Sequence, residues 1–443
     1  MNWMKSLYFS NRFFIMAGAI AVMFVFSYFI PFLLPIAKAL FLLWMGTTFS
    51  DFVILFYART AVEGSRLVPE RLSNGDENEI RIIIRNVLRI PVSISVIDEI
   101  PFQFQLRNFN FSLSLASGES KELIYKVRPV KRGEYEFGVV NIFVRSFLQL
   151  VSRKVTLEQE KVVPVYPSFI QMRKYELLAI SNRLVDPGIK RIRRIGHHLE
   201  FEQIKKYVAG DDARTINWKA TARKAELMVN NYQDERSQQV YCLIDKGRVM
   251  QMPFQGMSLL DYAINASLVI CNIAIRKSDR AGLITFQDKI GTLLTASRLN
   301  KQMATILEIL YNQKTAYRES DFSVLYSAVR RRIPQRSLLL LFTNFETVYS
   351  LKRQLPFIKN LAHQHLVVVI FFENTEMKSL VEQKAESLQS IYYKAVAEKF
   401  SYEKKMIVWE LHKNGIQALL TPPEKLTINI INKYLELKAR NVI

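Results

Sequence analysis

The stretch Gln239-Val-Tyr-Cys-Leu-Ile-Asp245 decides the fold of the second half of this chain. Its continuous apolar run predicts a strand that is buried on both faces. A long helix-like run, Leu259–Arg276, follows it. Further strands are expected at 281–286, 290–294, 337–343, 366–372 and 416–420, and further helices at 301–311, 322–332, 350–363, 385–414 and 423–438. This alternation predicts a doubly wound α/β domain over residues 238–443, built on a mainly parallel sheet.

The loop after Asp245 is the first candidate site, because ligands bind such sheets at the carboxyl ends of the strands. A strand that ends in aspartate and leads into a helix resembles a von Willebrand factor A domain. In that family the first loop reads Asp-x-Ser-x-Ser, and its oxygen atoms help to hold Mg²⁺. Here Gly247 and Val249 stand where the hydroxyls would be, Ser320 takes the threonine position, and Asn344 takes that of the second aspartate. We therefore expect a degenerate metal loop, with no metal and no cofactor.

A second feature precedes the strand, in Gly210-Asp-Asp-Ala-Arg-Thr-Ile-Asn-Trp-Lys-Ala-Thr-Ala-Arg223. We predict a helix from Ala213 to about Lys224 with Asp212 as its N-cap, because a carboxylate suits the positive end of a helix. Side chains four positions apart share a helix face. A guanidinium–indole stack and a paired cationic surface are therefore expected. The residues concerned are Asp211, Asp212, Arg214, Trp218, Lys219 and Arg223.

Three interpretations of this motif stay open. The helix could be pinned to the sheet by Trp218 and buried salt links, it could present a surface to a partner, or its carboxylates could perform acid–base chemistry. Adjacent carboxylates at a helix start are more typical of caps, so we place no catalytic residue here. The neighbouring pair His197-His198 has no Cys/His cluster to complete a metal site.

Together with Gly196-His-His-Leu-Glu-Phe201 and Tyr232-Gln-Asp-Glu235, the motif strongly resembles the signature of the bacterial domain-of-unknown-function 58 family. The resemblance covers essentially the whole chain. It implies a transmembrane hairpin, a β domain, the motif and a von Willebrand A-like domain, in that order. It also implies partners, namely a MoxR-type AAA+ ATPase and other von Willebrand A proteins. The function implied is non-enzymatic assistance in the assembly or activation of envelope proteins.

Residues 59–167 have the pattern of a β-sandwich. Short β-branched or alternating runs occur at 79–85, 92–97, 109–115, 122–127 and 139–144. Turn signals separate them, among them Asn74-Gly-Asp76 and Ser117-Gly118. Strands at this spacing predict an immunoglobulin-like sandwich that acts as a spacer or interaction module. Residues 168–237, which carry the motif, are expected to link it to the α/β domain.

The first 58 residues predict a membrane hairpin. Residues 13–30 are uncharged and long enough to span the hydrocarbon core, and a second apolar run at 32–57 carries Lys38 and Asp51, which weaken its assignment as a full span. Lys5 and Arg12 flank one outer end, and Arg59 flanks the other. Positive flanks predict a two-pass protein of the bacterial inner membrane whose soluble bulk faces the cytoplasm.

The charge balance points to an anionic neighbour. Lys and Arg exceed Asp and Glu by 61 to 40, a net charge of +21. Without a nucleic-acid fold or stacking platform, the basic run at 190–194 favours membrane lipids or an acidic protein over nucleic acid. The two cysteines, Cys242 and Cys271, are expected to be small core residues. The alternative function is a metal-dependent adhesion-type receptor or a hydrolase that uses the Asp245 loop.

Overall fold

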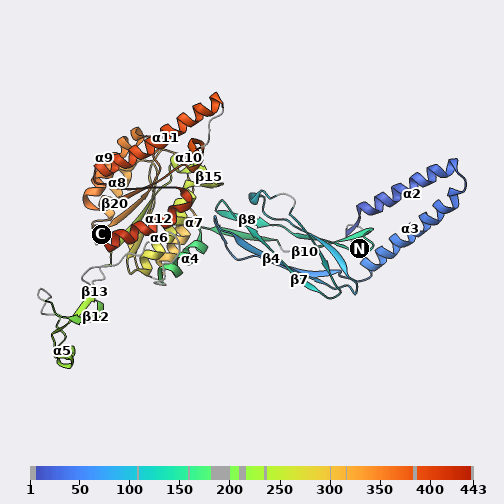
Figure 1. Cartoon of the computed structure of the whole chain (residues 1–443), viewed down its shortest axis with the longest axis horizontal. Helices are drawn as coiled ribbons and strands as arrows, with labels where there is room; N and C mark the ends of the chain where they lie inside the picture. The colour runs from blue at the N-terminus through green and yellow to red at the C-terminus, as the bar shows by residue number, and fades with distance from the viewer. Residues whose placement is uncertain are drawn as a thin grey trace. The chain divides into compact units, whose positions relative to one another are not determined.

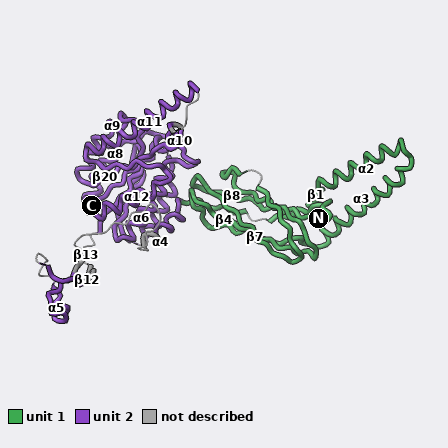
Figure 2. Tube along the Cα trace, viewed as in Figure 1, with its two compact units in different colours: residues 1–166 green, residues 167–443 purple. Residues whose placement is uncertain are grey.

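The computed structural model describes residues 6–106, 109–157, 160–180, 200–208, 216–233, 237–299, 301–315, 317–382 and 387–440. It contains two compact units, residues 1–166 and 167–443 (Figure 2). The membrane hairpin and the β domain expected from the sequence together make up the first unit. The finer division at residues 58, 167 and 237 stays a prediction.

Two apolar helices, α2 (Asn11–Phe29) and α3 (Leu33–Phe56), form a hairpin at the start of unit 1 (Figure 1). Both are long and apolar enough to cross a membrane, and their side chains are mostly exposed. A third helix in the described part of the chain, α6 (Leu259–Arg276), also meets that length and composition, but 83% of it is buried inside unit 2. The predicted pair of apolar helices is therefore confirmed, each able to span a membrane by length and composition, and α6 is a core helix.

The hairpin joins the β part of unit 1 directly. β1 (Leu7–Phe9) immediately precedes α2 and pairs with β10 (Val151–Leu157) in antiparallel register. At the other end, the guanidinium of Arg153 donates to the carbonyl oxygens of Leu55 and Ala58, at 2.7 and 2.8 Å. It thus satisfies one carbonyl group that the last turn of α3 leaves free, that of Leu55, and one just beyond the helix, that of Ala58. Both helices are therefore tied to one strand of the sheet.

In the described residues, the β part of unit 1 consists of three sheets whose strands pair in antiparallel register, except for the parallel pair of β3 and β11. One sheet follows the order β1, β10, β9 (Val140–Arg145), β5 (Val92–Asp98) and β6 (Asn110–Leu115). Others follow β2 (Val62–Leu67), β4 (Asn78–Asn86) and β7 (Ser120–Val127), and β3 (Leu72–Ser73), β11 (Lys161–Tyr166) and β8 (Gly133–Phe137). In β4 the side chains of Ile80, Ile82 and Ile84 are buried and alternate with more exposed ones, as the period of a strand requires. The five predicted strands are confirmed within two residues at each end.

Unit 2 is built on a sheet in the order β18 (Ile290–Ser297), β17 (Arg280–Phe286), β14 (Gln239–Asp245), β19 (Leu338–Phe342), β20 (Leu366–Phe372) and β21 (Gln417–Thr421). The pairs from β17 to β21 are parallel, and β18 is antiparallel. Alternate residues of β14 face opposite sides: Cys242 packs against α6, α7 (Gln302–Tyr311) and α12 (Leu426–Ala439), and Leu243 packs against α8 (Phe322–Arg332), α9 (Val348–Gln364) and α11 (Leu388–Lys413). The mainly parallel sheet with helices on both faces is confirmed (Figure 1).

The expected helix at 385–414 begins later than predicted. A capping box between Ser387 and Ser390 starts α11 at Leu388, and a separate helix, α10 (Thr375–Glu382), precedes it. Unit 2 also contains α4 (Phe169–Ile180), which contacts α6, and a separate hairpin of β12 (Glu200–Lys206) and β13 (Met228–Gln233). Both cysteines are buried in the core, as expected.

Candidate functional site at the carboxyl edge of the parallel sheet

Asp245 ends the central strand β14, and its buried side chain accepts three hydrogen bonds. One carboxylate oxygen accepts from the backbone N–H of Gly247 at 2.8 Å and from the hydroxyl of Ser320. The other accepts from the hydroxyl of Thr343 at 2.7 Å. Burial raises the pKa of this carboxyl, and these three donors oppose that shift. Asp245 is therefore a buried acceptor that neutral groups of its own chain hold in place.

This geometry does not fit a resident Mg²⁺ ion, which needs several oxygen ligands around an open position. A Cβ atom at Gly247 would lie 2.1 Å from Oγ of Ser320, so no serine fits there without a shift. Val249 packs partly buried against the apolar core. Among the described residues, no cluster of three or more His, Cys, Asp or Glu side chains has the arrangement of a metal site. Direct hydrogen bonds from Gly247, Ser320 and Thr343 occupy the Asp245 carboxylate.

Asn344 and Ser320, which the sequence placed in one site, line the same cavity as Asp245 but make different hydrogen bonds. Ser320 reaches Asp245 as expected, whereas the side-chain oxygen of Asn344 accepts from the ammonium of Lys404, on α11, at 2.7 Å. Lys404 also donates to the carbonyl of Phe345 at 2.6 Å. Burial lowers the pKa of Lys404 to about 8. No local pattern predicted this role for Lys404, because it follows Asn344 by sixty positions on a different helix.

A cavity of about 230 Å³ opens beside Lys404 at the ends of β19, β20 and β21. Its walls are mainly apolar and come from segments far apart in the chain, including Met252, Phe254, Phe372, Met377, Phe400 and Leu420. Glu346, Glu373, Lys378 and Lys405 stand among the polar lining residues. Concave apolar surface with a few polar groups, at the carboxyl ends of parallel strands, is the usual form of a ligand site.

The helix of the signature motif is shorter than predicted. α5 spans Trp218–Lys224, and its N-cap is Asn217, whose side chain accepts from the backbone N–H of Ala220 at 3.0 Å. Ile216 is in a β-bridge with Val229, so the helix cannot begin at Ala213 and Asp212 is not its cap. Asparagine at 217 competes well for the cap position because its short side chain reaches back to the first turn.

Part of the predicted motif lies outside the described residues. This applies to Asp211, Asp212 and Arg214, and to the histidine pair and the basic run at 190–194. The other motif side chains lie on the surface: Trp218 is 69% exposed, and Lys219 and Arg223 are exposed as well. Trp218 therefore does not pin this helix to the parallel sheet.

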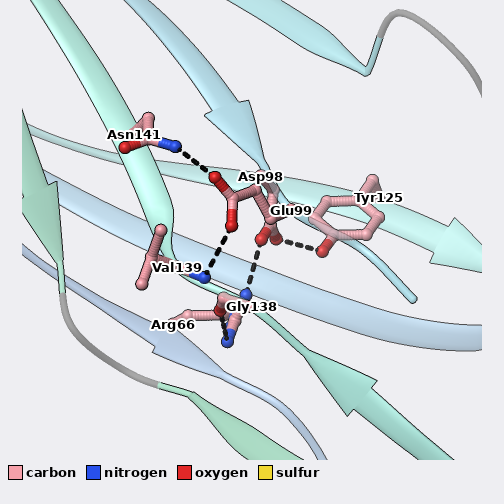
Figure 3. Close-up of polar contacts among 7 residues, drawn as sticks. All are labelled: Arg66, Asp98, Glu99, Tyr125, Gly138, Val139 and Asn141. Atoms are coloured by element: carbon pink, nitrogen blue, oxygen red, sulfur yellow. Dashed lines mark hydrogen bonds and ion pairs between the residues drawn. The ribbon is translucent and has the colours of Figure 1, made fainter. Parts of the chain in front are cut away.

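Unit 1 contains a buried polar cluster, which is shown in Figure 3. It includes the most buried ion pair among the described residues. Nη1 of Arg66, on β2, lies 2.5 Å from Oδ1 of Asp98, on β5, and the two side chains are 1% and 0% exposed. The hydroxyl of Tyr125, on β7, donates to Asp98, and Arg66 also donates to the carbonyl of Gly138 at 2.8 Å. Because β5 belongs to a different sheet from β2 and β7, this cluster ties the two sheets together and has a structural role.

Comparisons with known proteins show similarity to one family over part of the chain and leave the activity open. Residues 203–382 match the family described as "Protein of unknown function DUF58". The "Uncharacterized protein YeaD" of Bacillus subtilis (strain 168) is 23% identical over 243 residues, which cover 52% of this chain and 55% of YeaD. The chain thus spans about half the length of that curated relative.

Solved structures match about a quarter of the chain with low scores. An ASH/PapD-like domain of human CEP192 is 15% identical, with coverage of 25% of this chain and 87% of that domain and a TM-score of 0.20. The CARDB domain of PF1109 from Pyrococcus furiosus is 17% identical, with coverage of 24% and 93% and a TM-score of 0.18. The similarity to the DUF58 family that the signature motif indicated is carried by residues 203–382.

Proposed function

We propose that this chain is a membrane-anchored, non-enzymatic interaction protein that works with a MoxR-type AAA+ ATPase in the assembly of envelope proteins. The observation that carries the proposal is the exposure of Trp218 on α5, inside the segment that matches the family. A tryptophan that is 69% exposed leaves a large apolar surface in water. Tryptophan and arginine are the side chains that most often dominate protein–protein binding energy.

The charges around Trp218 support an acidic partner. Lys219, Arg223 and Lys224 are exposed on the same seven-residue helix. The neighbouring Glu226 pairs with Lys206 at 2.9 Å, so it compensates little of this charge on α5 itself. Cations around an aromatic anchor steer an acidic protein surface and fix its orientation. The ATPase as partner rests on the family resemblance of the motif.

The state of Asp245 supports binding rather than catalysis at the sheet edge. Its two oxygens already accept three hydrogen bonds, and it is 1% exposed. A general base or a metal ligand needs an oxygen that can reach the substrate or the ion. The alternative function, a hydrolase or a metal-dependent receptor, therefore has less support.

We further infer that residues 238–443 form a von Willebrand A-like domain. The strand order with a single antiparallel edge strand, β18, and an aspartate at the carboxyl end of β14 supports this. The two N-terminal helices anchor the chain in a bacterial inner membrane, with the soluble bulk in the cytoplasm. The basic residues Arg12 and Arg59, at the two outer ends of the hairpin, support that orientation.

The proposal is tested with the full chain in nanodiscs and the MoxR-type ATPase encoded in the same genome. The double variant Trp218→Ala, Arg223→Glu should weaken binding by about tenfold or more, because it removes an aromatic anchor and reverses a charge. The matched control is Trp409→Ala, Lys413→Glu on α11, where Trp409 is 54% exposed and the Lys413 ammonium lies 5.0 Å from its ring. This control should bind as the wild type does.

Two results would overturn the proposal. One is equal loss of binding in both double variants, which would show a nonspecific effect of charge. The other is wild-type binding by the Trp218 variant with an unchanged melting temperature. If that variant melts several degrees lower, α5 is structural and the interaction surface lies elsewhere.

A further inference from the structure

The Lys404 ammonium has an unusual environment. Its two hydrogen-bond acceptors, the side-chain oxygen of Asn344 and the carbonyl of Phe345, are both uncharged. The ring of Phe371 lies 5.6 Å from Nζ. Within the described part of the chain, no carboxylate lies within ion-pair distance of this lysine, although Glu346 acts on it from further away. A half-buried cation without an adjacent anion is costly, and a ligand that brings a negative charge would recover that cost.

The cavity beside Lys404 defines what that ligand must look like. Lys404 and Asn344 line one side of it, and apolar side chains such as Phe254, Phe372 and Leu420 line the rest. At about 230 Å³ it is smaller than the roughly 300 Å³ at which pockets for drug-sized ligands begin. The occupant is therefore short: an apolar group about the size of one side chain, with an anion next to it.

The charges that line the cavity favour a ligand with a carboxylate over one with a phosphate. Glu346, Glu373 and Glu376 line the same cavity as Lys404. Three ammonium groups, those of Lys378, Lys404 and Lys405, line it as well, so the lining has no net positive charge. A doubly charged phosphate would therefore add more excess negative charge beside the carboxylates than a single carboxylate would, and like charges repel. A single carboxylate matches the half-buried ammonium of Lys404.

We propose that this cavity binds the C-terminal carboxylate of a partner polypeptide whose last residue is apolar. The carboxylate pairs with the third N–H of the Lys404 ammonium, and the last side chain enters the apolar part of the cavity. The preceding peptide crosses the rim, where Lys378, Lys405 and the three glutamates present both signs of charge. A long acyl chain bears the same carboxylate but exceeds the volume of this cavity. Lys404 lies on α11 and not on α5. The test of this site is therefore independent of the test of the proposed function.

The test measures binding of three probes to the full chain in nanodiscs by calorimetry. They are a short acetylated peptide ending in alanine–leucine with a free carboxylate, the same peptide as a carboxamide, and octanoate. The free-acid peptide should bind at least about tenfold more tightly than the carboxamide, because only the acid forms a charge-assisted hydrogen bond. Lys404→Met should remove that preference, with no effect on the carboxamide. Lys399→Met, a change of an exposed lysine on the same helix that does not line the cavity, is the matched control and should keep it.

Each contrary result has a definite meaning. Equal affinity of acid and carboxamide for the wild type overturns the proposal without any variant, even if Lys404→Met fails to fold. Wild-type affinity in a stable Lys404→Met protein overturns the role of the lysine. Octanoate binding in the absence of peptide binding overturns the polypeptide as the occupant.

Discussion

The carboxylate of Asp51, in the second apolar helix, accepts a hydrogen bond from the hydroxyl of Ser146, which lies 95 positions further along the chain. Its other oxygen accepts from the backbone N–H groups of Leu150 and Val151, both at 2.9 Å. Asp51 is fully buried by these contacts with the turn between β9 and β10. Asp51, one of the two charges that weaken the assignment of a second span, therefore lies at the end of the helix that contacts the β part of unit 1. The 18 residues before it, 33–50, reach about 27 Å, close to the hydrocarbon thickness.

Asp51→Ala should destabilise the β part of unit 1 by about 3 kcal/mol or more, because it leaves a buried hydroxyl and two buried N–H groups without an acceptor. Thermal unfolding of the full chain in detergent, followed by the circular dichroism of the strands, measures this loss. Lys38→Leu, an exposed position in the same helix, is the control and should melt as the wild type does. A wild-type melting curve for Asp51→Ala would show that α3 is not anchored through this carboxylate.

The sequence predicted elements well where the signal is local. The alternation around Ile80, Ile82 and Ile84 predicted β4, and the apolar run before Asp245 predicted β14. The order of the strands depends on pairings between distant segments, which no local pattern contains. The N-cap of α5 was assigned to the wrong residue because two good cap residues, Asp212 and Asn217, lie five positions apart. Local preference cannot choose between them.

The candidate site was predictable only in part, for a related reason. Asp245 and Ser320 were expected together and do meet. The hydroxyl of Thr343, 98 positions away in the chain, donates to Asp245. The ammonium of Lys404, 60 positions away, donates to Asn344. Threonine at the end of a buried strand and lysine on an amphipathic helix are common in many roles, so their presence in the sequence carried no signal.

Gly247 should tolerate no side chain while Ser320 is present. Gly247→Ala places a Cβ atom 2.1 Å from the Ser320 hydroxyl oxygen, and such overpacking costs about 1–3 kcal/mol. Ser320→Ala alone removes a hydrogen bond to Asp245 and should cost about 1 kcal/mol. The double variant should be more stable than the sum of the two costs predicts, because the second change removes the clashing atom. Chemical unfolding of all four proteins measures this coupling, and strict additivity would contradict the geometry.

The stability contribution of Lys404 should depend on pH in the alkaline range. Its pKa of about 8 in the folded protein lies below its ordinary value of 10.5, so the charged form is disfavoured by folding. Between these values the unfolded chain binds a proton that the native chain does not, and stability therefore rises with pH. The melting temperature of the wild type relative to Lys404→Met should increase from about pH 7 to about pH 10.

The comparison with Lys404→Met is needed because other groups surround the same cavity. Glu346 faces Lys404 from the end of β19, Glu373 and Lys378 from the segment after β20, and Lys405 from α11. They remain in both proteins, so their titration cancels in the difference. A difference that stays constant over this range would show that the Lys404 ammonium keeps its ordinary pKa.

The orientation of the hairpin should be visible by cysteine labelling, since both native cysteines are fully buried and give little background. Phe32→Cys lies in the exposed turn between α2 and α3, and Ala116→Cys lies in the exposed turn before β7. With the soluble bulk in the cytoplasm, a membrane-impermeant maleimide should label Phe32→Cys in intact bacterial cells and Ala116→Cys only after lysis. The reverse pattern would place the bulk outside the membrane. Labelling of both positions in intact cells would also contradict a two-pass anchor with a cytoplasmic domain, because the β turn would then be accessible from outside.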